Sequence, residues 1–379
     1  MARRTKVFPP VLMKFEEDEE FVSFLKEKGF CEKDFSLPGS FCLYMKSEEK
    51  YSGFLKKKGG KRDIEIGRGK DGELLFKGSK KEIEDVLKSM DFSLSTPPMK
   101  IGKRTFCFGN KTYIMGIINV TPDSFYSNSR VPDVERAVET ALSMVECGAD
   151  IIDIGGESTR PGASPVSPEE EIRRILPVIK ELRKLTEIPI SVDTYKAKVA
   201  EKAIENGADM INDISGLRFD RRMVDVIKDA RVPVVLMHTS GKPSVMQKKT
   251  HYKWLLGEIS RYLWESIKKL KDLSELTILD PGIGFGKTPE QNLYILKHIE
   301  FLKIFGRPIL IGPSRKSFIG HLGGGEKPED RLEGTIAVLS IAVYKGVDFV
   351  RVHDVREAKK AISVVQSLKE IGRGNDGIY

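Results

Sequence analysis

The chain has 379 residues, of which 40% are hydrophobic and 31% are charged, and its formal net charge is +8. This composition is typical of a soluble globular protein, and the length allows two or three domains or one large α/β barrel with an attachment. No stretch approaches the roughly 18–20 uninterrupted apolar residues of a membrane span, and the first residues lack a signal-peptide core. We therefore expect a cytoplasmic protein that has no membrane partner.

The charges do not indicate a nucleic-acid partner. The 63 Lys and Arg residues are interleaved with 55 Asp and Glu residues, which is the pattern of a solvated mixed-charge surface. The four cysteines form no CxxC pair, so neither a zinc site nor a disulfide framework is expected. Glutamine occurs only three times and asparagine seven times, while Lys and Glu are abundant, which predicts a thermophilic source.

Residues 1–105 predict a small α+β module of unknown role. The segments RDIEIG and ELLFKG flank a Lys-Asp-Gly turn and predict a hairpin. FVSFLKEKGF and KKEIEDVLKSM have helical spacing, and STPPMKIG reads as a linker.

Residues 106–379 predict a (β/α)8 barrel. Short apolar runs alternate with amphipathic helical stretches, and the eight runs are YIMGIINVT, DIIDIGG, IPISVDT, DMINDIS, VPVVLMH, LTILDPG, PILIGPS and DFVRVHD. Runs that are apolar on both faces indicate parallel strands covered by helices. The alternative fold, a doubly wound sheet, would place a GxGxxG turn after the first strand, where this chain has NVTPDSF.

Every predicted strand ends in groups that can form hydrogen bonds or titrate. In chain order these are Asn119, Asp123, Asp153, Glu157, Asp193, Asn212, Asp213, His238, Asp280, Ser314, Arg315, Lys316, Arg351 and His353. In a closed barrel these ends meet at one mouth, where the active site of such folds lies. Acceptors from the middle strands would face donors and positive charge from the last strands. A ligand with planar N–H donors at one end and an anion at the other fits both, as an amino-oxo-pyrimidine ring with a phosphate or pyrophosphate would.

Each position also has a purely structural interpretation. Lys316 stands at an ordinary helix start, Arg351 and His353 could pair with Asp348 or Asp354, His238 could be a satisfied core histidine, and Asp280 could cap a turn. These alternatives stay open at the level of single residues.

Seven segments together resemble the dihydropteroate synthases, a family of pterin-binding barrels. They are MGIINVTPDSF, DIGGESTRPGA, SVDTYKAKVAEKAIENGADMINDISG, LMHTSGKPSVMQ, DPGIGFGKT, GPSRKSFIG and VRVHDV. The resemblance runs from about Tyr113 to about Ile371, in the family's order and with both signature loops intact.

The resemblance implies an enzyme, a transferase of folate biosynthesis. Its reaction would couple 6-hydroxymethyl-7,8-dihydropterin pyrophosphate with p-aminobenzoate to give 7,8-dihydropteroate and pyrophosphate, with Mg2+ as cofactor. The implied catalytic residues are Asp193, Asp280, Lys316, Arg351 and His353. Asp193, Asn212, Met237, Asp280, Phe285 and Lys316 would form the pterin pocket. The pyrophosphate would bind Asn119, Arg351 and His353, with the metal at Asn119. The p-aminobenzoate site would consist of Phe125, Thr159, Arg160, Pro161 and Ser317.

Elementary chemistry agrees with these roles. Positive charge and Mg2+ would stabilise the departing pyrophosphate. Asp123, or Asp193 and Asp280, could offset the positive charge left on the pterin methylene, and the arylamine would then need no strong base. This accounts for the lack of a recognisable Ser-His-Asp or Cys-His spacing. The family's barrels are often dimers, so we expect a homodimer.

Two alternatives remain. A pterin-dependent methyltransferase of the same superfamily would share the pterin acids, but it would not need the SRKS, RVHD and STRPG segments. An inactive pterin-binding partner protein would be expected to lack at least one anion ligand, and each is present in the sequence.

Overall fold

The computed structural model describes residues 11–14, 41–45, 65–68, 74–78, 83, 94–121, 130–159, 162–324 and 327–371. These residues divide into two compact units. The first takes the residues up to Thr96 together with Tyr252–Trp264 and His298–Arg307, and the second takes the rest of the chain. Within the described residues, no helix is long and apolar enough to cross a membrane.

The first unit contains a four-stranded antiparallel sheet. Its strands lie in the order β1 (Val11–Lys14), β2 (Phe41–Met45), β4 (Leu74–Gly78) and β3 (Glu65–Arg68). β3 and β4 pair antiparallel where the sequence predicts a hairpin. Apart from Ile83, which is helical, the two helices predicted before residue 91 lie outside the described residues.

The second unit is the predicted (β/α)8 barrel, and its eight strands coincide with the eight apolar runs. They are β7 (Tyr113–Asn119), β8 (Ile151–Gly155), β9 (Ile190–Asp193), β10 (Met210–Asp213), β11 (Val234–Met237), β12 (Thr277–Asp280), β13 (Leu310–Ile311) and β14 (Phe349–Val352). They form one parallel sheet in the order β12-β11-β10-β9-β8-β7-β14-β13. A parallel bridge between Leu279 and Ile309 joins the two ends of this sheet.

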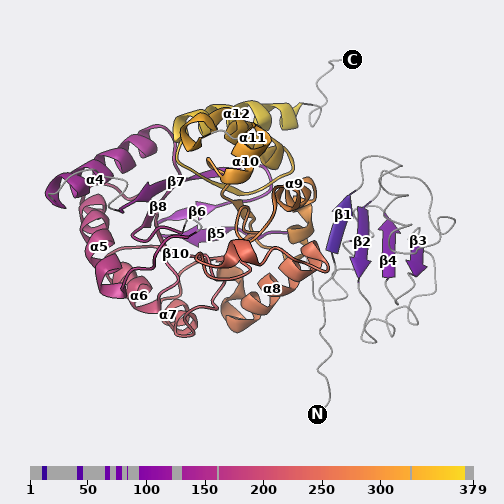
Figure 1. Cartoon of the computed structure of the whole chain (residues 1–379), viewed down its shortest axis with the longest axis horizontal. Helices are drawn as coiled ribbons and strands as arrows, with labels where there is room; N and C mark the ends of the chain where they lie inside the picture. The colour runs from indigo at the N-terminus through magenta and orange to yellow at the C-terminus, as the bar shows by residue number, and fades with distance from the viewer. Residues whose placement is uncertain are drawn as a thin grey trace, which may run out of the picture. The chain divides into compact units, whose positions relative to one another are not determined.

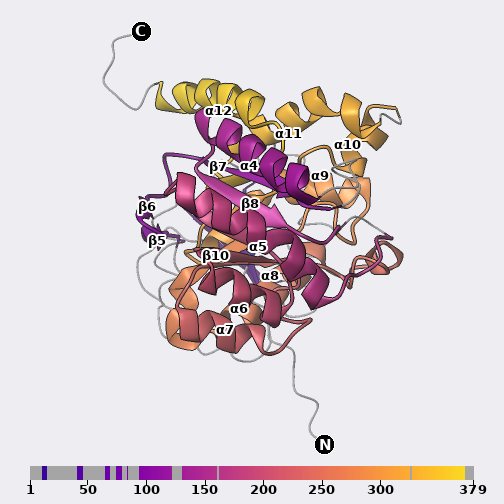
Figure 2. The same cartoon turned by 90° about the vertical axis from the view of Figure 1, so that its left-hand side faces the viewer.

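Helices cover the outside of the strands (Figures 1 and 2). They are α4 (Arg130–Glu146), α5 (Pro168–Leu185), α6 (Ala197–Glu205), α7 (Met223–Ala230), α8 (Leu255–Lys269), α9 (Pro289–Lys297), α10 (Ser317–Leu322), α11 (Leu332–Tyr344) and α12 (Val355–Glu370). Short 3-10 turns lie at η4 (Met246–Lys248), η5 (Lys271–Leu276), η6 (Ile299–Ile304) and η7 (Pro328–Asp330).

Helix α5 illustrates how local sequence sets these boundaries. Ser167 caps its start by accepting a hydrogen bond from the Glu170 amide at 3.1 Å, and Pro168 occupies the first turn, where no amide donor is needed. Three glutamates lie in the first turn, while Arg183 and Lys184 lie in the last, as the helix dipole favours.

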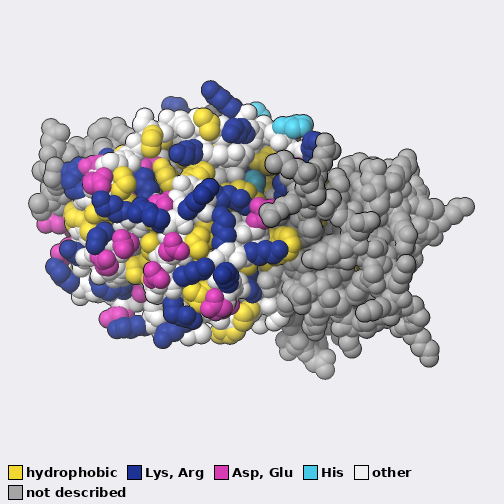
Figure 3. Space-filling view, turned by 90° about the horizontal axis from the view of Figure 1, so that it is seen from below, with side chains coloured by type: hydrophobic (Ala, Val, Ile, Leu, Met, Phe, Trp, Pro, Cys, Tyr) yellow, Lys and Arg dark blue, Asp and Glu magenta, His cyan; other side chains and the backbone are white. Residues whose placement is uncertain are grey.

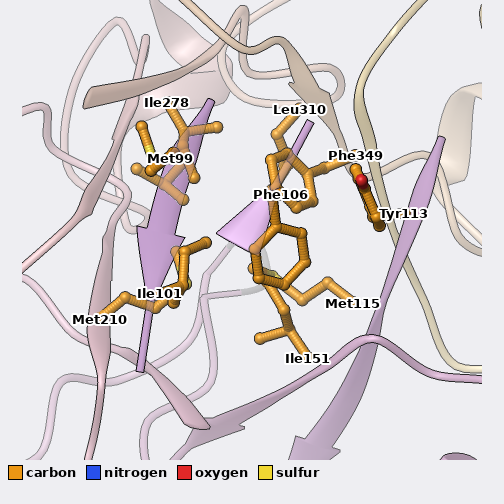
Figure 4. Packing of buried hydrophobic residues seen from close by; sticks show 11 residues of the cluster. Met99, Ile101, Phe106, Tyr113, Met115, Ile151, Met210, Ile278, Leu310 and Phe349 are labelled. Atoms are coloured by element: carbon orange, nitrogen blue, oxygen red, sulfur yellow. The ribbon is translucent and has the colours of Figure 1, made fainter. Parts of the chain in front are cut away.

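A short hairpin closes the end of the barrel where the strands begin. It consists of β5 (Met99–Ile101) and β6 (Arg104–Phe106), and its buried side chains join the starts of the barrel strands in one apolar cluster (Figure 4). The Phe106 ring packs edge-on against Tyr113 at 4.8 Å between centroids. Although the predicted boundary at residue 105 would place most of this hairpin in the N-terminal module, it packs inside the barrel unit.

On the face drawn in Figure 3, lysine and arginine side chains are interspersed with aspartate and glutamate. Among the described residues, exposed ion pairs such as Lys198 with Glu169, at 2.6 Å, also bring opposite charges together. This face therefore has the mixed charge that the sequence indicates.

Candidate active site

Arg351 connects three strands at the mouth of the barrel. From β14 its Nε donates to Asp153 Oδ2 on β8 at 2.6 Å, and its Nη2 donates to Asp193 Oδ2 on β9 at 2.7 Å. Asn212 on β10 donates to the same Asp153 oxygen at 3.1 Å. We call these four residues the Arg351 network. It excludes the alternative in which Arg351 pairs with Asp348 or Asp354, because Asp354 holds Arg315 and Asp348 accepts from the Ile309 amide.

Two oxygens of this network have no partner among the described residues. They are Asp153 Oδ1 and Asp193 Oδ1, and both are buried. An unsatisfied buried acceptor is costly, so a ligand with N–H donors would stabilise this wall. Burial raises the pKa of Asp193 to about 7, and the Asp153 charge adds to the rise while Arg351 opposes it.

Asp280, Lys316 and Phe285 form the neighbouring part of the mouth. Asp280 ends β12, accepts from the Gly282 amide at 2.7 Å and pairs in register with Met237, the buried last residue of β11. The Lys316 ammonium donates to the Ile283 carbonyl and lies 4.2 Å from the centre of the Phe285 ring. Desolvation lowers the pKa of Lys316 to about 7, and it raises the pKa of Asp280 above its usual range.

The loop between β12 and α9 is folded around the buried Lys287. Its Nζ donates to the carbonyls of Gly282 at 2.8 Å and Phe285 at 3.0 Å, and it lies 3.0 Å from His238 Nδ1. Burial lowers the pKa of Lys287 to about 7, and it also holds the pKa of His238 well below its ordinary value. Gly282 has a φ of +71°, and a Cβ there would lie 1.9 Å from the His238 carbonyl oxygen, so this turn requires glycine. His238 is thus a satisfied buried histidine.

Asn119, Ser314 and His353 meet where β7, β13 and β14 end. Asn119 Nδ2 lies 3.4 Å from His353 Nε2, and Ser314 Oγ lies 3.0 Å from His353 Nδ1. Ser314 Oγ also accepts from the His353 amide at 3.2 Å. The closure of the barrel therefore places Asn119 beside His353, with which the resemblance groups it.

Two of the five residues predicted for p-aminobenzoate are among the described residues. Thr159 lies in the loop after β8, and Ser317 is the exposed first residue of α10. Phe125, Arg160 and Pro161 lie outside the described residues, as does Asp123.

Two further residues differ from the simplest interpretation of the sequence. Arg315 binds Asp354 through two hydrogen bonds of 2.8 Å and also donates to the carbonyls of Pro328 and Glu329. Its guanidinium therefore holds the loop before α11 and does not join Arg351 and His353 at the mouth. The sequence marks Asp153 only as a polar strand end, yet this residue anchors both Arg351 and Asn212. Its signal is an ionisable residue inside a wholly buried strand.

Comparisons with known proteins agree with this geometry. Residues 115–353 match the family model described as pterin binding enzyme. A dihydropteroate synthase of Clostridium beijerinckii is 50% identical over 274 residues, which are 71% of this chain and 99% of that protein. The Xanthomonas albilineans dihydropteroate synthase structure with 4-aminobenzoic acid superposes with a TM-score of 0.68 at 41% identity, covering 73% of this chain and 100% of that one. A structure of the Xanthomonas enzyme in complex with 7,8-dihydropteroate gives a TM-score of 0.66 at 39% identity over the same shares.

Proposed function

The chain belongs to the dihydropteroate synthases of the pterin-binding enzyme family, and we propose that the Arg351 network and its neighbours carry the family reaction. The protein is a transferase of folate biosynthesis that condenses 6-hydroxymethyl-7,8-dihydropterin pyrophosphate with p-aminobenzoate to 7,8-dihydropteroate and pyrophosphate. One observation carries the assignment of residues: Arg351 places a fixed cation directly against two buried carboxylates at the mouth.

The pterin edge binds Asp193, Asn212 and Asp280. The unpartnered oxygen of Asp193 accepts a ring N–H, and the charge of Arg351 favours the ionised carboxylate that this bond needs. Met237 and Phe285 supply apolar surface, and Lys316 lies beside the ring pocket over Phe285.

The pyrophosphate binds Arg351, His353 and Asn119. Arg351 uses Nε and one Nη2 proton for its two carboxylates, which leaves further guanidinium protons for a phosphate oxygen. The imidazole of His353, which Ser314 and Asn119 hold in place, donates a ring N–H to a phosphate oxygen. These contacts stabilise the charge that develops on the leaving oxygen.

In this proposal Asn119 is the protein ligand of Mg2+. Within the described part of the chain, no group of three or more His, Cys, Asp or Glu side chains could hold a metal ion. Asn119 would contribute its amide oxygen, since the amide nitrogen faces His353, and phosphate oxygens and water would complete the shell that Mg2+ prefers. Bound there, the ion would neutralise charge on the pyrophosphate.

In the reaction, the bond between the pterin methylene carbon and the pyrophosphate oxygen breaks, and the oxygen keeps the electron pair. Asp193 and Asp280 offset the positive charge left on the methylene carbon. The arylamine nitrogen then bonds to that carbon and loses one proton, which the released pyrophosphate or water accepts. p-Aminobenzoate binds beside Thr159, in the loop after β8, and Ser317, at the start of α10. Phe125, Arg160 and Pro161 are assigned to the same site by family resemblance.

Three properties of the whole molecule complete the proposal. The protein acts in the cytoplasm and comes from a thermophile, which the scarcity of Gln and Asn supports. The segment before the barrel unit, which begins at Pro97, is a packing appendage.

The protein is a homodimer in this proposal. Apolar side chains stay exposed on the last two helices of the barrel, and these are Ile341, Tyr344, Val364 and Leu368. A second copy would cover them. Mass measurement in solution should give twice the chain mass, and Val364→Lys should shift the protein toward monomer. A monomeric wild type would contradict this part.

Binding of an unreactive pterin tests the site directly. Titration calorimetry with 6-hydroxymethylpterin should show about tenfold or greater weakening in Asp193→Asn and Asn212→Ala, because each removes a hydrogen bond in a buried pocket. Asp225→Asn, on α7, serves as a control and should bind normally. Unchanged affinity in both site variants would reject the pterin assignment.

A further inference from the structure

A second buried ion-pair network lies at the base of the loop between β8 and α5. Glu157 is the second residue of this loop and Val166 comes just before Ser167, the N-cap of α5. The Val166 amide donates to Glu157 Oε2 at 3.0 Å. The other Glu157 oxygen accepts from the Tyr195 hydroxyl at 2.6 Å. The loop that carries Thr159 is therefore tied together at its two ends.

Lys196 is the centre of this network. Its Nζ lies 2.5 Å from Glu157 Oε2, 2.5 Å from Glu171 Oε2 and 2.8 Å from the Val166 carbonyl oxygen. An ammonium group has three protons, so all three are used. One side chain thus joins the start of the loop, its end and the first turn of α5.

The position of Lys196 ties the loop to the pterin side of the mouth. Lys196 is the N-cap residue of α6 and comes three residues after Asp193 at the end of β9. Lys196 bonds both Glu157 and Val166, and its own backbone lies at the start of α6, directly after β9. The loop is therefore held relative to β9.

Close packing makes the network possible. A Cβ on Gly156 would lie 2.8 Å from Ile175 Cγ2 and 3.2 Å from the Glu171 carbonyl oxygen, so only glycine lets α5 approach the end of β8 this closely. Arg174 on α5 also donates to the Gly156 carbonyl at 2.9 Å.

The network is buried and sets one ammonium group against two carboxyl groups. The side chains of Lys196, Glu157 and Glu171 are only 12%, 5% and 1% exposed. Burial raises the pKa of Glu171, and Lys196 opposes that rise. Apolar side chains would fill such a space at least as stably as buried charges, so the gain from this arrangement is the defined geometry of its bonds.

We propose that Lys196 is a positioning residue for the arylamine. By holding Glu157 and Val166, it fixes the loop from which Thr159 reaches p-aminobenzoate. This inference rests on the proposed function, in which that loop contributes to the arylamine site. Asp193, Asn212 and Asp280 bind the pterin from other strands, so Lys196 should affect the two substrates unequally.

Steady-state kinetics of Lys196→Met tests the proposal, since methionine keeps the length of the side chain and removes its charge. We expect the KM for p-aminobenzoate to rise by about tenfold or more, while the KM for the pterin pyrophosphate stays within about twofold. Lys196→Arg should recover part of the loss. Lys198→Met is a matched control, because Lys198 lies on the same helix and pairs with Glu169 on α5 at an exposed site, and it should change neither KM.

Hydrogen exchange gives a readout that does not depend on catalysis. Peptides covering residues 157–166 should exchange faster in Lys196→Met than in wild type or Lys198→Met, because the Val166 amide loses its fixed acceptor. If Lys196→Met fails to fold, Tyr195→Phe should show the same changes in milder form.

The outcomes distinguish a failure of the proposed function from a failure of the proposed role of Lys196. An inactive wild type would refute the proposed function, while unchanged exchange in residues 157–166 would overturn the role of Lys196 whatever the activity. With an active wild type, equal rises in both KM values, or a lower melting temperature with an unchanged KM for p-aminobenzoate, would also overturn it.

Discussion

Among single residues, Arg351 determines the electrostatics of the mouth of the barrel. Its guanidinium stays charged at any working pH and has the planar set of donors needed to bind two carboxylates at once. It therefore lets Asp153 and Asp193 lie buried beside each other, and burial still raises the pKa of Asp193 to about 7.

This shift predicts how activity depends on pH. The ionised Asp193 is the acceptor for the pterin, so kcat/KM for the pterin pyrophosphate should rise as pH increases through about 7. The pKa of Asp193 is about 7 in the folded state and near 3.8 in the unfolded chain, so the folded state binds this proton more tightly. The contribution of Asp193 to stability therefore falls as pH rises from 3.8 to about 7. Rate profiles from about pH 5 to about pH 9 would measure this rise. Asp193→Asn should be weakly active and should lack it, whereas a wild-type profile that is flat near pH 7 would contradict the role.

The sequence marks these residues as polar strand ends but does not give their pairing. Polar strand ends predict a polar mouth, because parallel strands exit on one side. The contact from Arg351 to Asp153 joins residues 198 positions apart, and no local pattern encodes it. For the same reason the sequence left open whether Arg351 would pair with Asp348 or Asp354.

The loop between β12 and α9 is the element on which the position of Lys316 depends. Lys287 holds the Gly282 and Phe285 carbonyls, and the same turn presents the Ile283 carbonyl to Lys316. The loop thus acts as a rigid support for both the aromatic ring and the ammonium group of the pterin pocket.

Lys287→Met should weaken this support. Two buried carbonyls lose their donor, so the free energy of unfolding should fall by about 2–4 kcal/mol, and the KM for the pterin pyrophosphate should rise. Denaturant unfolding and steady-state kinetics measure the two effects, and Lys248→Met, on an exposed 3-10 turn, is the control. An unaltered unfolding free energy would show that Lys287 does not hold the loop.

The barrel elements were predictable because their strands are buried on both faces and give continuous apolar runs. There is a physical reason why the sequence does not show that the hairpin of β5 and β6 belongs to the barrel. Its three-residue strands follow a proline pair and carry almost no periodic signal, and their burial depends on strand starts as distant as Phe349.

At the scale of the whole molecule, every described residue of the site belongs to the barrel unit. The N-terminal sheet therefore contributes no described group to the chemistry. The barrel unit begins at Pro97, just before the hairpin of β5 and β6, which closes the end of the barrel where the strands begin.

A pair of truncations tests this division. Removing residues 1–96 should leave condensation activity within about threefold, because it spares the catalytic mouth. Removing residues 1–106 also deletes Met99, Ile101 and Phe106, each of which is buried and worth about 1.5–3 kcal/mol, so the barrel should unfold far more easily. Thermal unfolding and activity of the two proteins give the answer. Equal stability of the two would argue against the hairpin as part of the barrel core.

The most direct test of the proposed reaction is product formation by the purified 379-residue chain. It should be incubated with 6-hydroxymethyl-7,8-dihydropterin pyrophosphate, p-aminobenzoate and Mg2+ at moderate and elevated temperature, with Arg351→Met in parallel. Mass spectrometry should detect 7,8-dihydropteroate and an equal amount of pyrophosphate for the wild type, and the rate for Arg351→Met should be lower by about 10²–10³-fold. No dihydropteroate from a folded wild-type protein at any temperature would contradict the account.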